Sequence, residues 1–176
     1  MTRSVAAMTT PISTARHPFI EDFEKSWGFI RSMTYEFIEA VPPEHWHFSP
    51  HPGCAPLAKQ FRHMAWLSGV YNDTLRNRVM EFAKKKTFYS GGLERAELVA
   101  ALRSRDEELK QLLRDVEKGG VDSCRVEMPF LGRAMRFGEF ANVIIQHECL
   151  HHGLWSLYAR LAGFVTPQSW LFNFGL

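Results

Sequence analysis

Cysteine is scarce in this 176-residue chain, which contains only Cys54, Cys124 and Cys149. The number is odd, and the spacing is not that of a metal-binding motif. Such usage excludes a disulfide framework of the kind that stabilises small secreted proteins. Proteins that keep their thiols reduced are typical of the cytosol. We therefore expect a cytoplasmic protein.

The sequence also lacks long apolar runs and a strong charge of either sign. No uncharged apolar stretch approaches the roughly 20 residues that a membrane-spanning helix needs. The formal net charge is +2, and basic residues cluster only at residues 84–86. A run of three lysines is typical of a solvated helix end. We expect neither a membrane nor a nucleic-acid partner, and predict a small-molecule substrate instead.

Apolar residues recur at helical spacing in four segments, which span residues 18–40, 57–84, 94–118 and 137–163. This pattern predicts an all-α protein, a four-helix bundle formed by one domain over residues 18–176. Residues 1–17 are expected to be a disordered tail. The connection over residues 121–136 is longer than the others. It predicts either a short β-hairpin or an extended crossover before the last helix.

Two further segments are predicted to form surface or to cover another part of the protein. The third segment has a face of mixed charge, which indicates solvated surface; it consists of Arg103, Arg105, Asp106, Glu107, Glu108 and Lys110. Residues 164–176 have no charged side chain and contain Trp170, Phe172 and Phe174. Such an apolar tail is expected to cover either its own bundle or a partner subunit.

The last predicted helix carries two histidines one turn apart, His147 and His151. On an ideal helix they lie about 40° apart, near the middle of the apolar stripe. Buried imidazoles need partners, and one divalent metal ion would satisfy both. The stripe consists of Phe137, Phe140, Val143, Ile144, Leu150, Leu154, Leu157, Tyr158 and Leu161.

Residues 147–151 match the H-E-x-x-H motif of zinc metalloproteases. Neither known continuation of that motif is present. Leu154 and Leu157 stand where a metzincin has Gly and His, and residues 152–176 contain no acidic third ligand. The third ligand is therefore expected upstream, and His63 on the second helix is the candidate, since two ligands on one helix need a third from a facing helix.

Glu148 is a weak candidate for a catalytic residue. The motif would make it a general base, but on an ideal helix it points about 100° away from His147. We favour a surface or supporting contact, for example with His152 one turn further on. Cys149 is expected to face away from the metal.

The connection over residues 42–56 contains five prolines and three histidines. His45, His47 and His51 are an alternative metal site, although loops hold ligand geometry less well than helices do. Cys54, which follows them, is interpreted as a small buried side chain, with a position near the metal as the alternative.

Three stretches of the chain resemble the motifs of one family. They are Trp46-His47-Phe48-Ser49-Pro50, Phe61-Arg62-His63-Met64-Ala65-Trp66, and His147-Glu148-Cys149-Leu150-His151-His152-Gly153. They are similar to the W-x-P segment, the first metal-binding histidine and the final H-x-x-x-H-x-G of the DinB/YfiT-like superfamily of metal-dependent enzymes, over about residues 18–167. The family commonly has Arg-Gly-Gln after the last ligand, whereas this chain has His152-Gly153-Leu154.

The resemblance implies a four-helix bundle, often a homodimer, in which His63, His147 and His151 hold a divalent metal such as Zn or Ni. Characterised relatives include transferases and isomerases that depend on low-molecular-weight thiols. We predict a metal-dependent enzyme, either a thiol-dependent transferase or a hydrolase, because three imidazoles leave a coordination position open. The alternatives are a non-catalytic metal-binding stress protein, an H-E-x-x-H zinc metalloprotease, and a bundle whose histidines are core residues.

Overall fold

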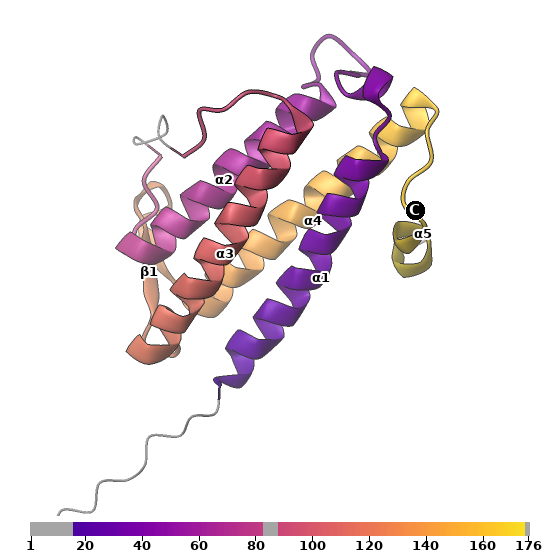
Figure 1. Ribbon diagram of the computed structural model, residues 1–176. Coiled ribbons are helices and arrows are strands. Elements are labelled where there is room, and N and C mark those ends of the chain that lie inside the picture. The colour runs from indigo at the N-terminus through magenta and orange to yellow at the C-terminus, as the bar shows by residue number, and fades with distance from the viewer. Residues whose placement is uncertain (1–15, 83–87, 175–176) are drawn as a thin grey trace, which may run out of the picture.

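In the computed structural model, four long helices lie side by side in one bundle (Figure 1). The structure describes residues 16–82 and 88–174. The expected tail, residues 1–17, therefore lies almost wholly outside the described residues. No described helix is both long and apolar enough to span a membrane. The prediction of a mainly α-helical bundle is confirmed.

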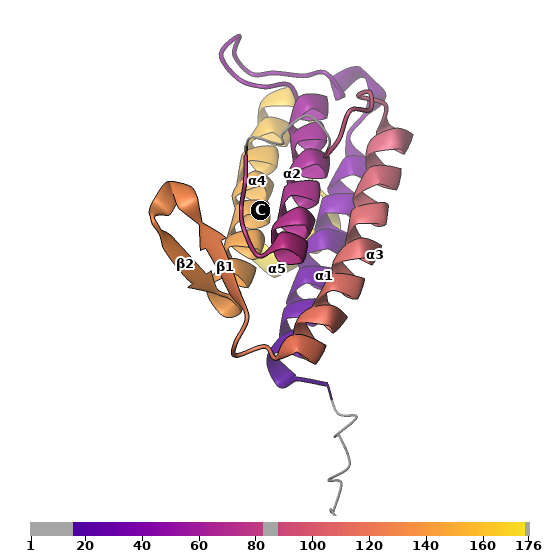
Figure 2. The ribbon, with the colours of Figure 1, turned by 90° about the vertical axis from the view of Figure 1, so that its left-hand side faces the viewer.

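The four long helices form a closed ring. They are α1 (Pro18–Ala40), α2 (Leu57–Asn77), α3 (Arg95–Gly119) and α4 (Phe137–Ala162), and a short α5 (Gln168–Phe174) follows. α1 packs against α3 and α4, and α2 packs against the same two helices. The grooves between α1 and α3 and between α2 and α4 therefore lie on different sides of the bundle (Figures 1 and 2).

Local sequence sets the ends of α1 where the apolar pattern predicted them. The His17 Nδ1 accepts a hydrogen bond from the Phe19 backbone N–H at 3.3 Å, and Pro18 occupies the first turn, where its missing N–H has no consequence. The helix ends at Ala40, directly before Val41 and Pro42. A single 3-10 turn, η1 (Pro43–His45), then leads into the proline-rich connection.

The prediction that the second helix continues to residue 84 is wrong. α2 ends at Asn77, because Arg78 adopts a left-handed conformation with a φ of 58°. The chain then pairs with the start of the hairpin: Glu127 N donates to Arg78 O at 2.8 Å, and Met80 N donates to Glu127 O at 2.9 Å. Tertiary pairing therefore ends a helix whose own sequence contains no glycine stop signal. Residues 83 and 84 lie outside the described residues.

The connection before α4 is a β-hairpin, the first of the two predicted alternatives. β1 (Arg125–Met128) pairs antiparallel with β2 (Arg133–Arg136) beside the bundle (Figure 2). A 3-10 turn, η3 (Pro129–Leu131), joins them, and Gly132 follows it with a φ of 63°, which favours glycine. Val126, Met128 and Met135 face the core.

The apolar core consists of two clusters along the bundle axis. On α1, the first cluster includes Phe23 and Trp27 and the second includes Met33 and Phe37. Buried polar side chains lie between the clusters on three helices: Arg31 and Thr34 on α1, Ser68 on α2, and Glu148, His151 and His152 on α4. We call these six residues the polar layer. The core is therefore interrupted at one level.

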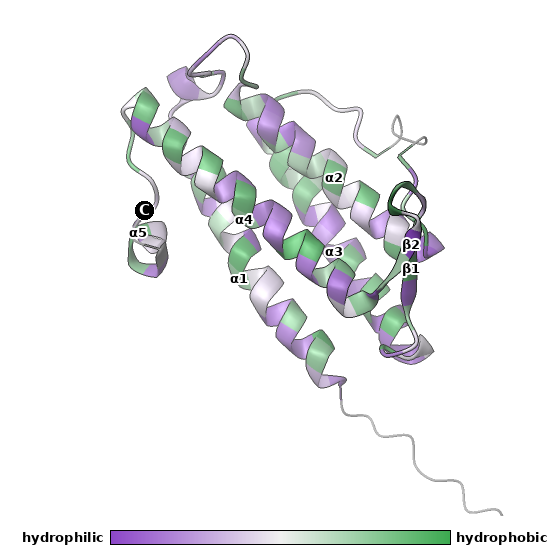
Figure 3. Cartoon of the chain, turned by 180° about the vertical axis from the view of Figure 1, so that it is seen from behind, coloured by the Kyte–Doolittle hydropathy of each residue, from purple (hydrophilic) through white to green (hydrophobic). Residues whose placement is uncertain are grey.

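In the C-terminal half of α4, four of the five residues predicted for the apolar stripe are not buried. Four leucines face outward with relative exposures of 41–63%, and they are Leu150, Leu154, Leu157 and Leu161. Hydrophobic and hydrophilic residues alternate along the whole of α4 (Figure 3), so hydropathy along the helix does not by itself identify its buried face. The buried positions in this half are Glu148, His151, His152, Trp155, Ser156, Tyr158 and Ala159, so only Tyr158 of the predicted stripe is buried there. The helix is rotated so that its polar residues complete the polar layer, which composition alone does not reveal.

The C-terminal segment covers its own chain, one of the two expected outcomes. Trp170 of α5 is fully buried, and its ring stacks on that of Phe37 with the ring centroids 4.9 Å apart. Its Nε1–H donates a hydrogen bond to the Met33 carbonyl at 3.2 Å. Its ring also lies 4.8 Å from that of His152. α5 therefore closes one side of the polar layer, while Leu171 and Phe172 remain exposed.

The mixed-charge face of α3 is not simply solvated, which corrects the prediction. Asp106 accepts a hydrogen bond from Arg31 Nε at 3.1 Å, and Glu108 accepts one from Asn72 Nδ2 at 2.8 Å. Glu108 also pairs with Arg76 and Arg105. Burial alone would raise the pKa of Glu108, but these three donors lower it to about 2.

We expect Glu108→Gln to destabilise the bundle by on the order of 2 kcal/mol at neutral pH. The folded pKa of about 2 lies below the ordinary glutamate pKa of 4.5, so this contribution is present above about pH 4.5 and is lost as the pH falls toward 2. Denaturant titrations at pH 7 and at pH 3 measure the free energy of unfolding where this contribution is present and where much of it is lost. Glu107→Gln, at an exposed neighbouring position, is the control, and an equal loss in both variants would contradict the prediction.

Candidate metal centre

The three predicted ligands come together although they belong to two helices. His63 lies on α2, and His147 and His151 lie one turn apart on α4. One ring nitrogen from each histidine lies within 4.8 Å of the other two. In the described part of the chain, these three side chains form a group that could hold one metal ion. Exposure falls from His63, which is exposed, through His147 to His151, which is buried. The groove between α2 and α4 therefore presents three imidazoles that are open to solvent on one side.

The contacts within this cluster leave imidazole nitrogens poorly satisfied. The Nε2 atoms of His147 and His151 face each other at 3.2 Å. Two neutral imidazoles can share only one proton in such a contact. The Nδ1 of His151 is buried and has no hydrogen-bond partner among the described residues. A metal ion that accepts nitrogen lone pairs fits this donor set better than further hydrogen bonds do.

Burial favours the neutral, metal-binding form of all three rings. Burial lowers the pKa of His63. Burial and the neighbouring His63 together lower the pKa of His147. Burial and the two neighbouring histidines lower the pKa of His151 to about 4. Metal ligands must be deprotonated, so these rings do not have to lose a proton at neutral pH before they bind a cation.

A cavity of about 330 Å³ adjoins the cluster and is lined by His63, His151, Cys54, Lys59 and Tyr158, among others. This volume is at the lower end of the range for small-molecule sites. Cys54 is exposed, so the interpretation of a buried side chain is wrong and the alternative position near the site is correct. A thiol and an ammonium group thus share one cavity with two of the histidines.

A second hollow, of about 300 Å³, is also lined by His63. Lys59 and Arg62 line it together with Trp66 and Tyr89. Lys59 borders both hollows, so the solvent side of the cluster carries two cationic side chains. This surface favours anionic ligands near the histidines.

Glu148 is neither a surface residue nor a member of the histidine cluster. Its side chain is only 1% exposed and accepts a hydrogen bond from Arg31 Nη1 at 2.9 Å. Arg31 also donates to Ser68 Oγ at 2.9 Å and to Asp106. Glu148 therefore points into the polar layer, away from the position that the general base of an H-E-x-x-H protease would occupy, which counts against that alternative.

The expected contact between Glu148 and His152 is made through Thr34. The Thr34 hydroxyl donates to Glu148 and lies 2.8 Å from His152 Nε2. Because its single proton goes to the carboxylate, the hydroxyl accepts from His152. Burial, followed by the charge of Arg31, lowers the pKa of His152 to about 3, so the ring is neutral.

Arg31 and Thr34 were missed by the sequence reasoning, although a signal was present. Both occur inside the apolar stripe of the first helix, between Trp27 and Phe37. A charged residue on a buried helix face requires a buried partner. That partner could have been sought among acidic residues at the same level of the bundle.

The loop histidines do not form the alternative site. His45 stacks on Phe164 at 5.6 Å, and His51 Nδ1 accepts a hydrogen bond from the Gly53 backbone N–H at 3.0 Å. His47 is exposed. Within the described residues, the three do not form a group that could hold one ion.

The fold and the site together define a helical bundle with a three-histidine cluster between its second and fourth long helices. The model of the DinB superfamily matches residues 27–154, which is most of the chain. The chain belongs to the DinB superfamily. A comparison with curated proteins found no significant match.

Substitution of Arg31 by Met should destabilise the fold by about 3–5 kcal/mol, because Glu148 would keep a buried charge without its partner. The double variant Arg31→Met, Glu148→Met should recover much of this loss, since both charges are then absent. Urea denaturation of Arg31→Met, Glu148→Met and the double variant measures the coupling free energy between the two side chains. Additive losses would show that the pair does not act as a unit.

Proposed function

We propose that this protein is a metal-dependent transferase that uses a low-molecular-weight thiol as cosubstrate. His63, His147 and His151 would hold one divalent ion, Zn or Ni. When bound to three neutral imidazoles, such an ion supplies a Lewis acid with an open position, which lowers the pKa of a thiol or a water molecule. The observation that carries the proposal is the approach of three ring nitrogens to within 4.8 Å of one another beside a small cavity.

The surroundings of the cluster favour a thiol cosubstrate over water alone. Glutathione, mycothiol and bacillithiol are polar molecules, and glutathione and bacillithiol carry carboxylates, which Lys59 and Arg62 can pair with at the rim. In the reaction, the thiolate sulfur attacks an electrophilic carbon, the bond to the leaving group breaks, and the thiol proton passes to solvent. Glu148 has no direct part, because Arg31 and Thr34 already occupy its carboxylate.

Metal content tests the first half of this proposal. Untagged protein should contain about one Zn or Ni per chain by mass spectrometry, and His63→Ala, His147→Ala and His151→Ala should each lose it. The helices are held mainly by apolar packing, so the circular dichroism should stay helical. His51→Ala, in the exposed loop, is the control that should keep its metal. Retention of the metal in His63→Ala would refute the ligand set.

Activity tests the second half with the metal-loaded protein. Glutathione, mycothiol and bacillithiol are each supplied with 1-chloro-2,4-dinitrobenzene, and conjugate formation is compared between wild type and His151→Ala. Conjugation that requires the metal supports a transferase. Metal-dependent hydrolysis of p-nitrophenyl acetate without thiol would make the protein a hydrolase, and bound metal without any turnover would make it a non-catalytic metal-binding protein.

We further propose a homodimer that forms through the outer face of α4. Leu157 and Leu161 are each more than half exposed there, beside Leu150 and Leu154. Such a row of large apolar side chains is uncommon on a monomer and typical of an interface. In sedimentation, wild type should behave as a dimer and the double variant Leu157→Asp, Leu161→Asp as a monomer. A monomeric wild type would exclude this interface.

A further inference from the structure

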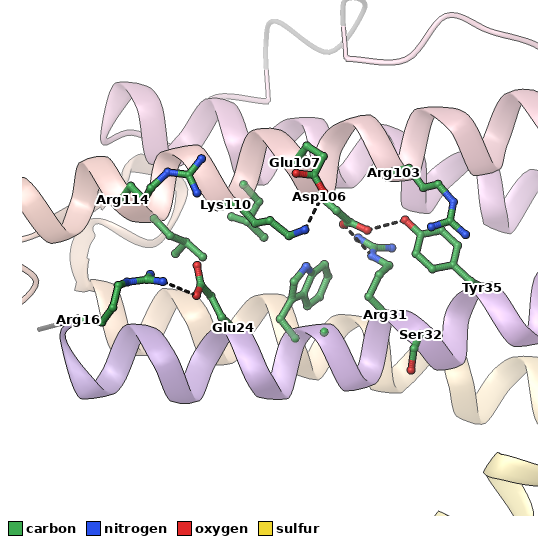
Figure 4. Close-up of a pocket in the computed structure, with 14 residues that line it drawn as sticks. Arg16, Glu24, Arg31, Ser32, Tyr35, Arg103, Asp106, Glu107, Lys110 and Arg114 are labelled. Atoms are coloured by element: carbon green, nitrogen blue, oxygen red, sulfur yellow. Dashed lines mark hydrogen bonds and ion pairs between the residues drawn. The ribbon is translucent and has the colours of Figure 1, made fainter.

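A further cavity lies between α1 and α3 (Figure 4). The histidine cluster lies between α2 and α4, on a different side of the bundle. The cavity between α1 and α3 has a volume of about 620 Å³, roughly twice that of the cavity beside His63. None of the three histidines lines it. It is therefore a separate space, within the volume range typical of small-molecule sites.

Part of the wall of this cavity is apolar. Trp27 of α1 and Leu109 and Leu113 of α3 line it, and Trp27 is only 8% exposed. Gly28 lies beside Trp27, and a Cβ added there would have no neighbouring atom within 4 Å. A glycine within a helix costs about 1 kcal/mol relative to alanine. At this position it keeps the space in front of α1 open.

The acceptors of the cavity are already engaged. Three carboxylates line it, and each has a basic partner in the structure (Figure 4). The pairs are Glu24 with Arg16 at 3.0 Å, Asp106 with Arg31 at 3.1 Å, and Glu107 with Lys110 at 2.6 Å. The cavity therefore has little capacity to attract a cation.

One donor group, by contrast, remains available. The guanidinium of Arg103 lies over the Tyr35 ring at 4.4 Å and makes no hydrogen bond to any described residue. The Nε1–H of Trp27 also has no acceptor among the described residues, but this atom is buried and is therefore not exposed to a ligand in the cavity. Trp27 also borders a void of about 10 Å³, which could hold at most one water molecule. A free guanidinium beside an apolar wall fits a ligand that brings its own acceptors.

We propose that the cavity between α1 and α3 binds a small organic acid with a flat apolar body. The body packs against Trp27 in front of Gly28, and the acidic group accepts hydrogen bonds from the guanidinium of Arg103. An arginine that stacks on an aromatic ring keeps its N–H groups oriented for a carboxylate or sulfonate. This site does not depend on the metal centre.

The test uses the full chain and two probes with the same aromatic body. 1-Anilinonaphthalene-8-sulfonate carries an acidic group, and N-phenyl-1-naphthylamine does not. We expect the sulfonate to bind with a stoichiometry of about one and to shift the indole N–H resonance of Trp27, which Trp27→Phe identifies among the five tryptophans. Arg103→Gln should weaken its binding about tenfold, as expected for loss of a hydrogen bond to a charged group.

Two matched controls separate the site from other apolar surfaces. Arg114→Gln should bind normally, because Arg114 lines the cavity but already donates to Gln111. Gly28→Leu should abolish binding by filling the cavity, whereas Gly153→Leu, an equally open helical glycine on α4, should not. An unmoved Trp27 resonance, equal binding of the neutral probe, or unchanged binding in Gly28→Leu would each overturn the proposal.

Discussion

The buried ion pair between Arg31 and Glu148 is the constraint on which the rest of this bundle depends. Both side chains are almost inaccessible, at 3% and 1% exposure. An unpaired charge at such a depth costs several kcal/mol, more than most single apolar contacts contribute. The relative rotation of α1 and α4 is therefore set by this pair. Apolar packing alone would tolerate several rotations of a leucine-rich helix.

That rotation explains where the other residues of α4 lie. With Glu148 turned toward α1, His147 and His151 are turned toward α2, where they meet His63. The leucines of the same helix are left on the outside. The histidine cluster and the exposed leucine row are thus two consequences of one polar contact.

Much of the fold could be predicted from the sequence because its signals are local. Proline and glycine mark most helix ends, and the i, i+4 histidines with His63 identify the candidate ligands. The early end of α2 could not be predicted, because it depends on pairing between Arg78 and Glu127, which are far apart in sequence. The outward leucines were mispredicted for a related reason: hydrophobicity identifies an apolar face, but a buried charge pair can override it.

Arg31 also connects the two sides of the molecule. It lines the cavity between α1 and α3, and its guanidinium bonds Glu148, the residue after His147. The H-E-x-x-H pattern therefore has a different physical meaning here from its meaning in a protease. Its histidines face one groove, while its glutamate anchors the helix from within the core. A five-residue motif specifies spacing, but the chemistry of each residue depends on which neighbouring helix it faces.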